Sequence, residues 1–241
     1  MTGSGQARAY VVTHSATEHV GTFGTWLPEA GLALDVANPW DGEPLLDRVG
    51  PDVTGHAALV VMGGPQQAYD DTSAPWLAQT KALLRAAVAD GVPVLGVCLG
   101  GQLLAEATGG VVERGAEGPE LGARLVATRD VAREDPLFWD VPLSPVVVQW
   151  HWDAVTELPP GAVLLASSPR YPHQAFRVGE RAWGLQFHLE TPPEMVRGWA
   201  DADADAVRAA GLDPEAVAAR TVAELPEVED VWRPVLERFA A

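Results

Sequence analysis

The first half of the chain alternates short apolar runs with longer amphipathic stretches, and this alternation constrains the fold more than any other feature. Four runs rich in Val, Leu and Ala predict strands at residues 9–13, 32–36, 57–62 and 93–97. The stretches between them predict helices at residues 16–30, 75–90 and 99–108. Strands that alternate with helices pair in parallel, so we expect an α/β fold, a three-layer sandwich with a mostly parallel central sheet.

The second half has a different texture, because its apolar segments are shorter and are separated by Pro and Gly. This pattern favours antiparallel strands, expected at residues 121–127, 146–149, 163–166, 174–178 and 182–187. Helical periodicity returns at Pro193, with further helices expected at residues 214–224 and 227–239. Since no repeat or linker divides the chain, we expect one domain over residues 1–241, in which residues 193–241 form a helical C-terminal extension.

Composition excludes several classes of partner. The 241 residues include 33 acidic and 16 basic side chains, a formal net charge of −17, and no Lys- or Arg-rich run. Nucleic acid and anionic membrane are therefore not expected as partners. The amino terminus lacks the pattern of a secretory signal, and no apolar stretch is long enough to span a bilayer, so we expect a cytoplasmic protein.

The only cysteine, Cys98, lies where a predicted strand turns into a predicted helix. A single cysteine excludes an internal disulfide and a multi-cysteine metal site, and leaves either an inert buried thiol or a reactive one. The surrounding glycines, Gly96, Gly100 and Gly101, allow a strained turn and close approach of a substrate. The positive end of the following helix favours the thiolate, so we predict that Cys98 is a nucleophile.

A cysteine nucleophile requires a base that also protonates the leaving group, together with a group that orients the base. His188 and Glu190 follow a predicted apolar strand, and residues two apart on an extended segment point to the same side. We therefore predict that His188 is the acid and base and that Glu190 orients it. For the other five histidines we expect a structural role.

The turn after the strand at residues 57–62 contains Gly63 and Gly64, at the same predicted sheet edge as Cys98. Acyl transfer needs free backbone N–H groups that bind the oxyanion of the tetrahedral intermediate. A Gly-Gly-Pro sequence alone indicates only a turn, but its place before the nucleophile strand predicts an oxyanion hole. Its donors would be the N–H groups of Leu99 and of Gly64 or Gly63.

Three segments resemble the class I (triad-type) glutamine amidotransferases, which include the amidotransferase domain of GMP synthase and its free-standing relatives. They are VVMGGP from Val60, VLGVCLGGQLLAEATGG from Val94 and WGLQFHLE from Trp183, with a weaker match, QWHWDAV from Gln149, to the family's His-x-Asp loop. The resemblance implies a flavodoxin-like sandwich and the hydrolysis of glutamine through a thioester on Cys98. It implies no cofactor and no metal.

The same resemblance implies residues that bind the substrate. The glutamine that matches Gln102 contacts the substrate amino acid in this family, and the backbone that matches Trp150 and His151 completes the pocket. Aromatic packing on a sheet edge is an equally good interpretation of Trp150. Leu189 departs from the pattern, because many members have proline after the catalytic histidine.

Three functions agree with these residues. The first is a glutaminase that supplies ammonia to a separate synthase subunit, because nothing after Glu190 resembles a synthetase domain and no phosphate-binding loop occurs. The second is a free-standing γ-glutamyl hydrolase or peptidase. The third is a non-catalytic regulatory module on the same scaffold, which would be expected to carry a broken triad.

Overall fold

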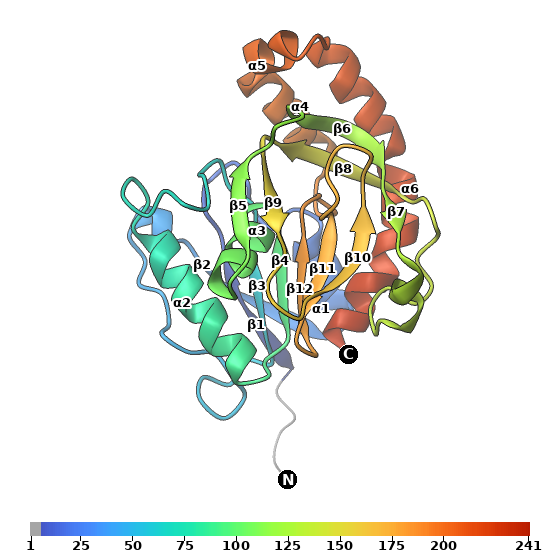
Figure 1. Ribbon diagram of the computed structural model, residues 1–241. Helices are drawn as coiled ribbons and strands as arrows, with labels where there is room; N and C mark the ends of the chain where they lie inside the picture. Colours follow the sequence, from blue (N-terminus) through green and yellow to red (C-terminus); the bar gives the residue numbers. More distant parts are fainter. Residues whose placement is uncertain (1–5) are drawn as a thin grey trace.

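The computed structural model describes residues 6–241, and an eight-stranded sheet lies at the centre of the described part (Figure 1). Its strand order is β2-β1-β3-β4-β12-β11-β10-β7. The parallel part consists of β1 (Ala7–Val12), β2 (Leu32–Ala37), β3 (Ala58–Val61), β4 (Val94–Val97) and β12 (Ala182–Leu185). The predicted α/β fold with a mostly parallel sheet is confirmed.

The remaining strands are antiparallel, as expected for the second half of the chain. The sheet is completed by β11 (Ala175–Val178), β10 (Val163–Ser167) and β7 (Ala127–Thr128). Two small sheets pair β5 (Val111–Arg114) with β9 (Asp153–Glu157) and β6 (Glu120–Leu125) with β8 (Val146–His151). The strands β5 and β9 lie outside the predicted segments, and the strand predicted at residues 121–127 ends at the first residue of β7.

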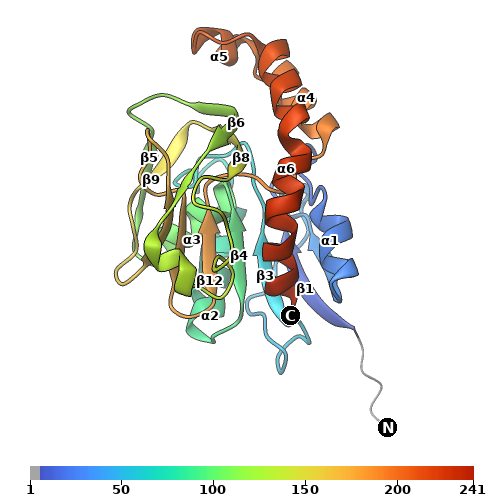
Figure 2. The same ribbon diagram turned by 90° about the vertical axis from the view of Figure 1, so that its right-hand side faces the viewer.

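Helices cover both faces of the sheet (Figure 2). On one face lie α2 (Trp76–Ala89) and α3 (Leu99–Ala107), and on the other lie α1 (Phe23–Glu29) and α6 (Pro214–Ala240). Alternate residues of one strand serve the two faces, because Val11 belongs to the core beneath α1 and α6 whereas Val12 belongs to the core beneath α2 and α3. Successive apolar residues of a strand thus contribute to two separate cores, one on each face of the sheet.

The predicted helix at residues 16–30 is wrong in its first part, because α1 begins only at Phe23. Residues 14–22 form a loop that local hydrogen bonds hold: Ser15 Oγ accepts from the Glu18 N–H, and His19 Nδ1 accepts from the Gly21 N–H. Gly21 has a φ of +51°, which does not fit a right-handed helix. The loop places Glu18 in the cavity described below.

The two helices predicted at residues 214–224 and 227–239 are one continuous helix, α6. The periodicity suggested a break near Pro226, yet this proline lies inside the helix. Tertiary packing overrides the local cost, because Trp232, Leu236 and Phe239 bury their side chains in the core. The helices α4 (Pro193–Ala202) and α5 (Ala204–Ala209) precede α6, and α4 starts at Pro193 as predicted.

Two short 3₁₀ helices complete the architecture, at Pro39–Asp41 and Asp130–Glu134. No helix within residues 6–241 is both long and apolar enough to cross a lipid bilayer.

Candidate active site

Cys98 lies at the turn between β4 and α3, where the sequence places an elbow. Its φ is +50° and its ψ is −108°, and it is the one non-glycine residue within 6–241 that has a positive φ. Such a conformation is strained for any side chain with a Cβ and is typical of nucleophile elbows. The strain persists because both sides are fixed: the Cys98 N–H donates to Leu185 O at 2.8 Å, and Cys98 O accepts from the Gln102 N–H at 2.9 Å.

The glycines around the cysteine are required by close backbone packing. A Cβ at Gly100 would lie 2.0 Å from Val61 O, and a Cβ at Gly101 would lie 2.5 Å from Leu185 O. A Cβ at Gly96 would meet Gly100 O at 2.5 Å. These contacts hold the first turn of α3 against β3 and β12, which fixes the position of the sulfur.

His188 and Glu190 form a buried pair beside this elbow. His188 Nδ1 lies 2.7 Å from Glu190 Oε1, and the two side chains are 1% and 2% exposed. The predicted contact is present, but its predicted cause is wrong: β12 ends at Leu185, and His188 is held instead by an isolated antiparallel bridge to Val148. The second carboxylate oxygen of Glu190 accepts the Leu189 N–H at 2.9 Å, which fixes the carboxylate as well.

The remaining ring nitrogen of His188, Nε2, interacts with Cys98. Burial of the ring opposes a positive charge, but the charges of Glu190 and Cys98 and hydrogen bonds to both residues outweigh it, so the pKa of His188 lies well above its ordinary value. The environment therefore stabilises an imidazolium. Since Nδ1 is engaged by Glu190, the proton on Nε2 faces the sulfur.

The loop after β3 lies against the same groups. A Cβ at Gly63 would lie 3.0 Å from His188 Cε1 and 3.6 Å from Cys98 Cβ. A Cβ at Gly64 would meet the Leu99 side chain at 2.8 Å. Within residues 6–241 the N–H groups of Gly63, Gly64 and Leu99 make no hydrogen bond to another backbone group. The structure thus brings all three predicted oxyanion-hole residues around the cysteine.

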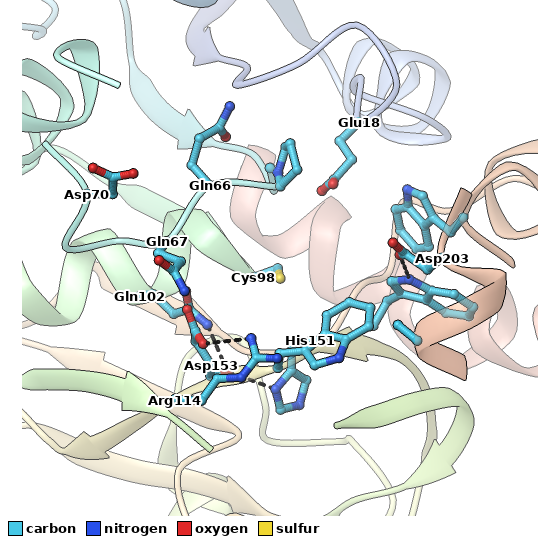
Figure 3. Close-up of a pocket in the computed structure, with 16 residues that line it drawn as sticks. Glu18, Gln66, Gln67, Asp70, Cys98, Gln102, Arg114, His151, Asp153 and Asp203 are labelled. Atoms are coloured by element: carbon cyan, nitrogen blue, oxygen red, sulfur yellow. Dashed lines mark hydrogen bonds and ion pairs between the residues drawn. The ribbon is translucent and has the colours of Figure 1, made fainter. Parts of the chain in front are cut away.

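Cys98 opens into a cavity of about 610 Å³ (Figure 3). A volume of this size accommodates a drug-sized ligand. Its walls come from several parts of the chain: the β1–α1 loop, the loop after β3, α3, β5, the β8–β9 connection, and the segment around α4 and α5. Four carboxylates line it, from Glu18, Asp70, Asp153 and Asp203, against one guanidinium, from Arg114. The cavity is therefore strongly acidic.

The three residues predicted to bind substrate all line this cavity, but they are engaged in different ways. Gln102 Nε2 donates to Asp153 O at 3.0 Å and to Gln186 Oε1 at 3.2 Å. Both ring nitrogens of His151 are within hydrogen-bond distance of protein oxygens, Asp153 O at 2.9 Å and Glu120 Oε2 at 3.2 Å. The segment expected as a His-x-Asp loop forms β8 and β9.

The side chain of Trp150, and not only its backbone, contacts other residues that line the cavity. Its Nε1–H donates to Asp203 Oδ2 at 2.8 Å, and its ring packs against that of Trp199 with centroids 5.8 Å apart. The Trp199 ring in turn lies 4.6 Å from the His188 ring. Trp150 thus packs against another aromatic ring and also lines the cavity, whereas its contact with a substrate stays a prediction.

Several residues in the cavity or beside Cys98 were not predicted from the sequence. Glu18, Trp199 and Asp203 line the cavity from loops or helices whose sequence carries no recognisable motif. Gln186 Nε2 lies 3.9 Å from Cys98 Sγ and is 2% exposed. Its place two residues before His188, inside a matched segment, was the one available signal.

Glu18 is the most unusual of the missed residues. Its carboxylate oxygen Oε2 lies 2.7 Å from the position of a Cβ on Gly63, close to His188 Cε1 and Cys98 Cβ. Within the described residues no donor is hydrogen-bonded to this carboxylate. Burial raises the pKa of Glu18 from 4.5 to about 7; the His188 charge opposes this rise, and Glu190 and Asp203 add to it. The ionised form is therefore unfavourable in the free protein.

The Glu18→Gln substitution is expected to stabilise the protein at alkaline pH. Because folding raises the pKa of Glu18, ionisation of this carboxylate lowers the stability of the folded state. This destabilisation is absent below the pKa of the unfolded chain and complete above about pH 7. The difference in unfolding free energy between the Glu18→Gln variant and the original protein, measured by urea unfolding, should grow by about 2 kcal/mol between about pH 5.5 and about pH 8. The same substitution at the exposed residue Glu117 is the matched control, and an equal gain there would contradict the assignment.

The fold and this arrangement define a class of protein, the cysteine-dependent amidohydrolases. A model of the family "Glutamine amidotransferase class-I" matches residues 37–196, which include the elbow and the His188–Glu190 pair. The chain belongs to the class I glutamine amidotransferase family.

Three similar proteins are consistent with membership of this family. A glutamine amidotransferase-like protein, YfeJ, of Salmonella typhimurium is 30% identical over 79% of this chain and 79% of its own length. Gamma-glutamyl peptidase 4 of Arabidopsis thaliana is 30% identical over 66% of this chain and 64% of its own. A GMP synthase of Parafrankia sp. is 40% identical over 58% of this chain but only 24% of its own length.

A solved structure shows the same fold over almost the entire chain. The glutamine amidotransferase of Thermotoga maritima superposes with a TM-score of 0.85 at 28% identity, covering 98% of this chain and 99% of the other. The flavodoxin-like sandwich with C-terminal helices, expected from the resemblance, is therefore confirmed.

Proposed function

We propose that this protein hydrolyses the amide bond of a γ-glutamyl conjugate through a thioester on Cys98. Membership of the family supports glutamine-type amides as the chemical class of the substrate. The observation that carries the proposal is the acidic cavity of about 610 Å³ that opens beside the cysteine, because free glutamine is much smaller than a ligand that fills such a volume.

The first half of the reaction follows from the buried His–Glu pair. The Cys98 thiolate attacks the γ-carbonyl carbon, and the C–N bond then breaks while His188 Nε2 transfers its proton to the leaving nitrogen. Glu190 keeps the ring in the tautomer with Nδ1 protonated and stabilises its positive charge. The products of this half are the free amine and a γ-glutamyl thioester.

The second half uses the same groups in reverse. Water attacks the thioester carbonyl as His188 removes its proton, and the C–S bond breaks to release glutamate and the thiolate. In both halves the carbonyl oxygen becomes an oxyanion. The free N–H groups of Leu99 and of Gly64 or Gly63 lie around Cys98 and are the donors we assign to it.

A comparison of substrates tests the proposal. Release of glutamate is measured from free glutamine and from a set of γ-glutamyl dipeptides and γ-glutamyl amines, with Cys98→Ala protein as the blank. We expect kcat/KM to be larger for at least one conjugate than for glutamine, because part of the cavity lies beyond the reach of the glutamine side chain. A clear preference for glutamine over every conjugate would refute the choice of a conjugate.

The second candidate is a glutaminase that supplies ammonia to a synthase. The likeness to GMP synthase favours it, since that enzyme hydrolyses glutamine, although this chain matches only 24% of its length. This candidate predicts weak glutaminase activity that increases when a synthase encoded by a neighbouring gene is added. Activity that no such protein increases would count against it.

A further inference from the structure

One wall of the cavity combines two carboxylates with two tryptophans. Glu18 and Asp203 lie on the same side of Cys98 in Figure 3, whereas Asp70 lies on the opposite side. Trp150 and Trp199 line the same part of the cavity, and Trp150 is hydrogen-bonded to Asp203. We call Glu18, Asp203, Trp150 and Trp199 the acidic–aromatic wall.

The chemistry of this wall suits a cation. Carboxylates form charge-assisted hydrogen bonds with ammonium groups, and the face of a tryptophan attracts a cation through its quadrupole. Glu18 has no hydrogen-bond donor among the described residues, and the charge that lowers its pKa comes from His188. A positively charged group of the substrate would give this carboxylate its partner.

The wall lies on the side of the scissile bond from which the amine departs. His188 donates the proton to the leaving nitrogen, and both Glu18 and Trp199 lie next to the His188 ring. The centroids of the Trp199 and His188 rings are 4.6 Å apart. Glu18 Oε2 and His188 Cε1 both lie near the position that a Cβ on Gly63 would take. A group attached to the leaving nitrogen therefore extends along the acidic–aromatic wall. The γ-glutamyl part lies on the other side of the bond.

We infer that the leaving group is an amine with a second positive charge, such as an alkyl diamine or polyamine, and that the acidic–aromatic wall selects it. The inference rests on the proposed hydrolysis of γ-glutamyl conjugates and specifies its substrate class. Glu18 is the residue that determines specificity, because its carboxylate has no hydrogen-bond donor within residues 6–241 and lies beside Gly63, where His188 and Cys98 also approach. Anionic leaving groups are repelled by the carboxylate of Asp203 and would make ionisation of Glu18 still less favourable.

Three matched substrates test the inference: the γ-glutamyl amides of 1,4-diaminobutane, butylamine and 4-aminobutanoate. They share a four-carbon chain that ends in an ammonium, a methyl or a carboxylate group. We expect kcat/KM for the diamine conjugate to exceed that for the butylamide by about tenfold or more, and the 4-aminobutanoate conjugate to be the poorest substrate.

Two variants identify the residue responsible. Glu18→Gln should lower kcat/KM for the diamine conjugate by more than it lowers kcat/KM for the butylamide, so that the ratio of the two values falls several-fold toward one. Asp70→Asn removes a carboxylate from the opposite side of the cavity and should leave the ratio of diamine to butylamide kcat/KM unchanged. This control separates a direct contact with Glu18 from the overall negative potential of the cavity.

The outcomes distinguish this inference from the function on which it rests. If kcat/KM for the butylamide equals that for the diamine conjugate, the selection of a cation is refuted and γ-glutamyl hydrolysis stands. The same follows if Glu18→Gln leaves the ratio of these two kcat/KM values unchanged. If glutamine alone is hydrolysed, the inference is refuted in favour of the ammonia-supplying candidate. If none of the four compounds is hydrolysed, the proposed function fails and the inference fails with it.

Discussion

Replacement of Cys98 by alanine is expected to lower the rate of amide hydrolysis by at least about a thousandfold. Every covalent step in the proposed mechanism passes through this sulfur. The backbone of the elbow is held by hydrogen bonds to Leu185 and Gln102 that do not involve the side chain, so the fold should be kept. Steady-state rates together with circular dichroism and urea unfolding measure both effects.

A covalent label gives an independent test of the same residue. A diazo-ketone analogue of glutamine should add one equivalent of mass to the original protein and none to the Cys98→Ala variant, because Cys98 is the only cysteine. Turnover retained in the variant would show that the nucleophile lies elsewhere. Complete inertness of the original protein toward the analogue, under conditions where it hydrolyses substrate, would show the same.

The second large effect is expected at His188. Loss of the imidazole removes both the activation of the thiol and the protonation of the leaving amine, so His188→Ala should lower kcat/KM by about a thousandfold or more. Since the alanine variant leaves the buried Glu190 without its partner, it should also be less stable. His188→Gln fills more of the site and can donate to Glu190, which separates lost chemistry from lost stability.

Glu190→Gln provides the graded comparison. It removes the charge that orients and stabilises the imidazolium but leaves the imidazole in place, so its loss of activity should be about a hundredfold smaller than that of His188→Ala. The pH–rate profile should also change, because Glu190 contributes to the raised pKa of His188. Equal damage in the two variants would mean that Glu190 does more than orient the ring.

The elbow could be predicted because its determinants are contiguous in the sequence. Strand, cysteine, glycines and helix all fall within one short segment, and the close contacts of Gly96, Gly100 and Gly101 explain why these residues are glycines. The His188–Glu190 contact could be predicted for the same reason, although the chain is bent there rather than extended. Local pattern is sufficient when a feature is made by neighbours in sequence.

The acidic–aromatic wall could not be predicted in this way. The N–H of Glu18 donates to Ser15 Oγ, as at the start of a helix, and the sequence pattern predicted that Glu18 lies in a helix. Asp203 lies between α4 and α5, where nothing in the local pattern distinguishes it from the many other acidic residues. The two meet only because the strand order brings the β1–α1 loop and the C-terminal helices to the same end of the sheet.

The continuous helix α6 was missed for a related reason. Pro226 indicates a break when it is considered alone, because proline removes a backbone donor and disfavours the helical conformation of the preceding residue. Apolar side chains on both halves of the helix pack into the same core, and this burial outweighs the local penalty. Tertiary contacts of this kind are not visible in the periodicity of a single segment.

Trp199 and Asp203 reach the cavity from α4 and the residue that follows it, whereas the sulfur is held by β4 and α3. Two of the four residues of the acidic–aromatic wall and the turn that holds the nucleophile are thus encoded in separate stretches of the gene. Evolution can vary the segment after Pro193 and retune which metabolite is accepted, while the glycine-locked turn that strains Cys98 remains unchanged.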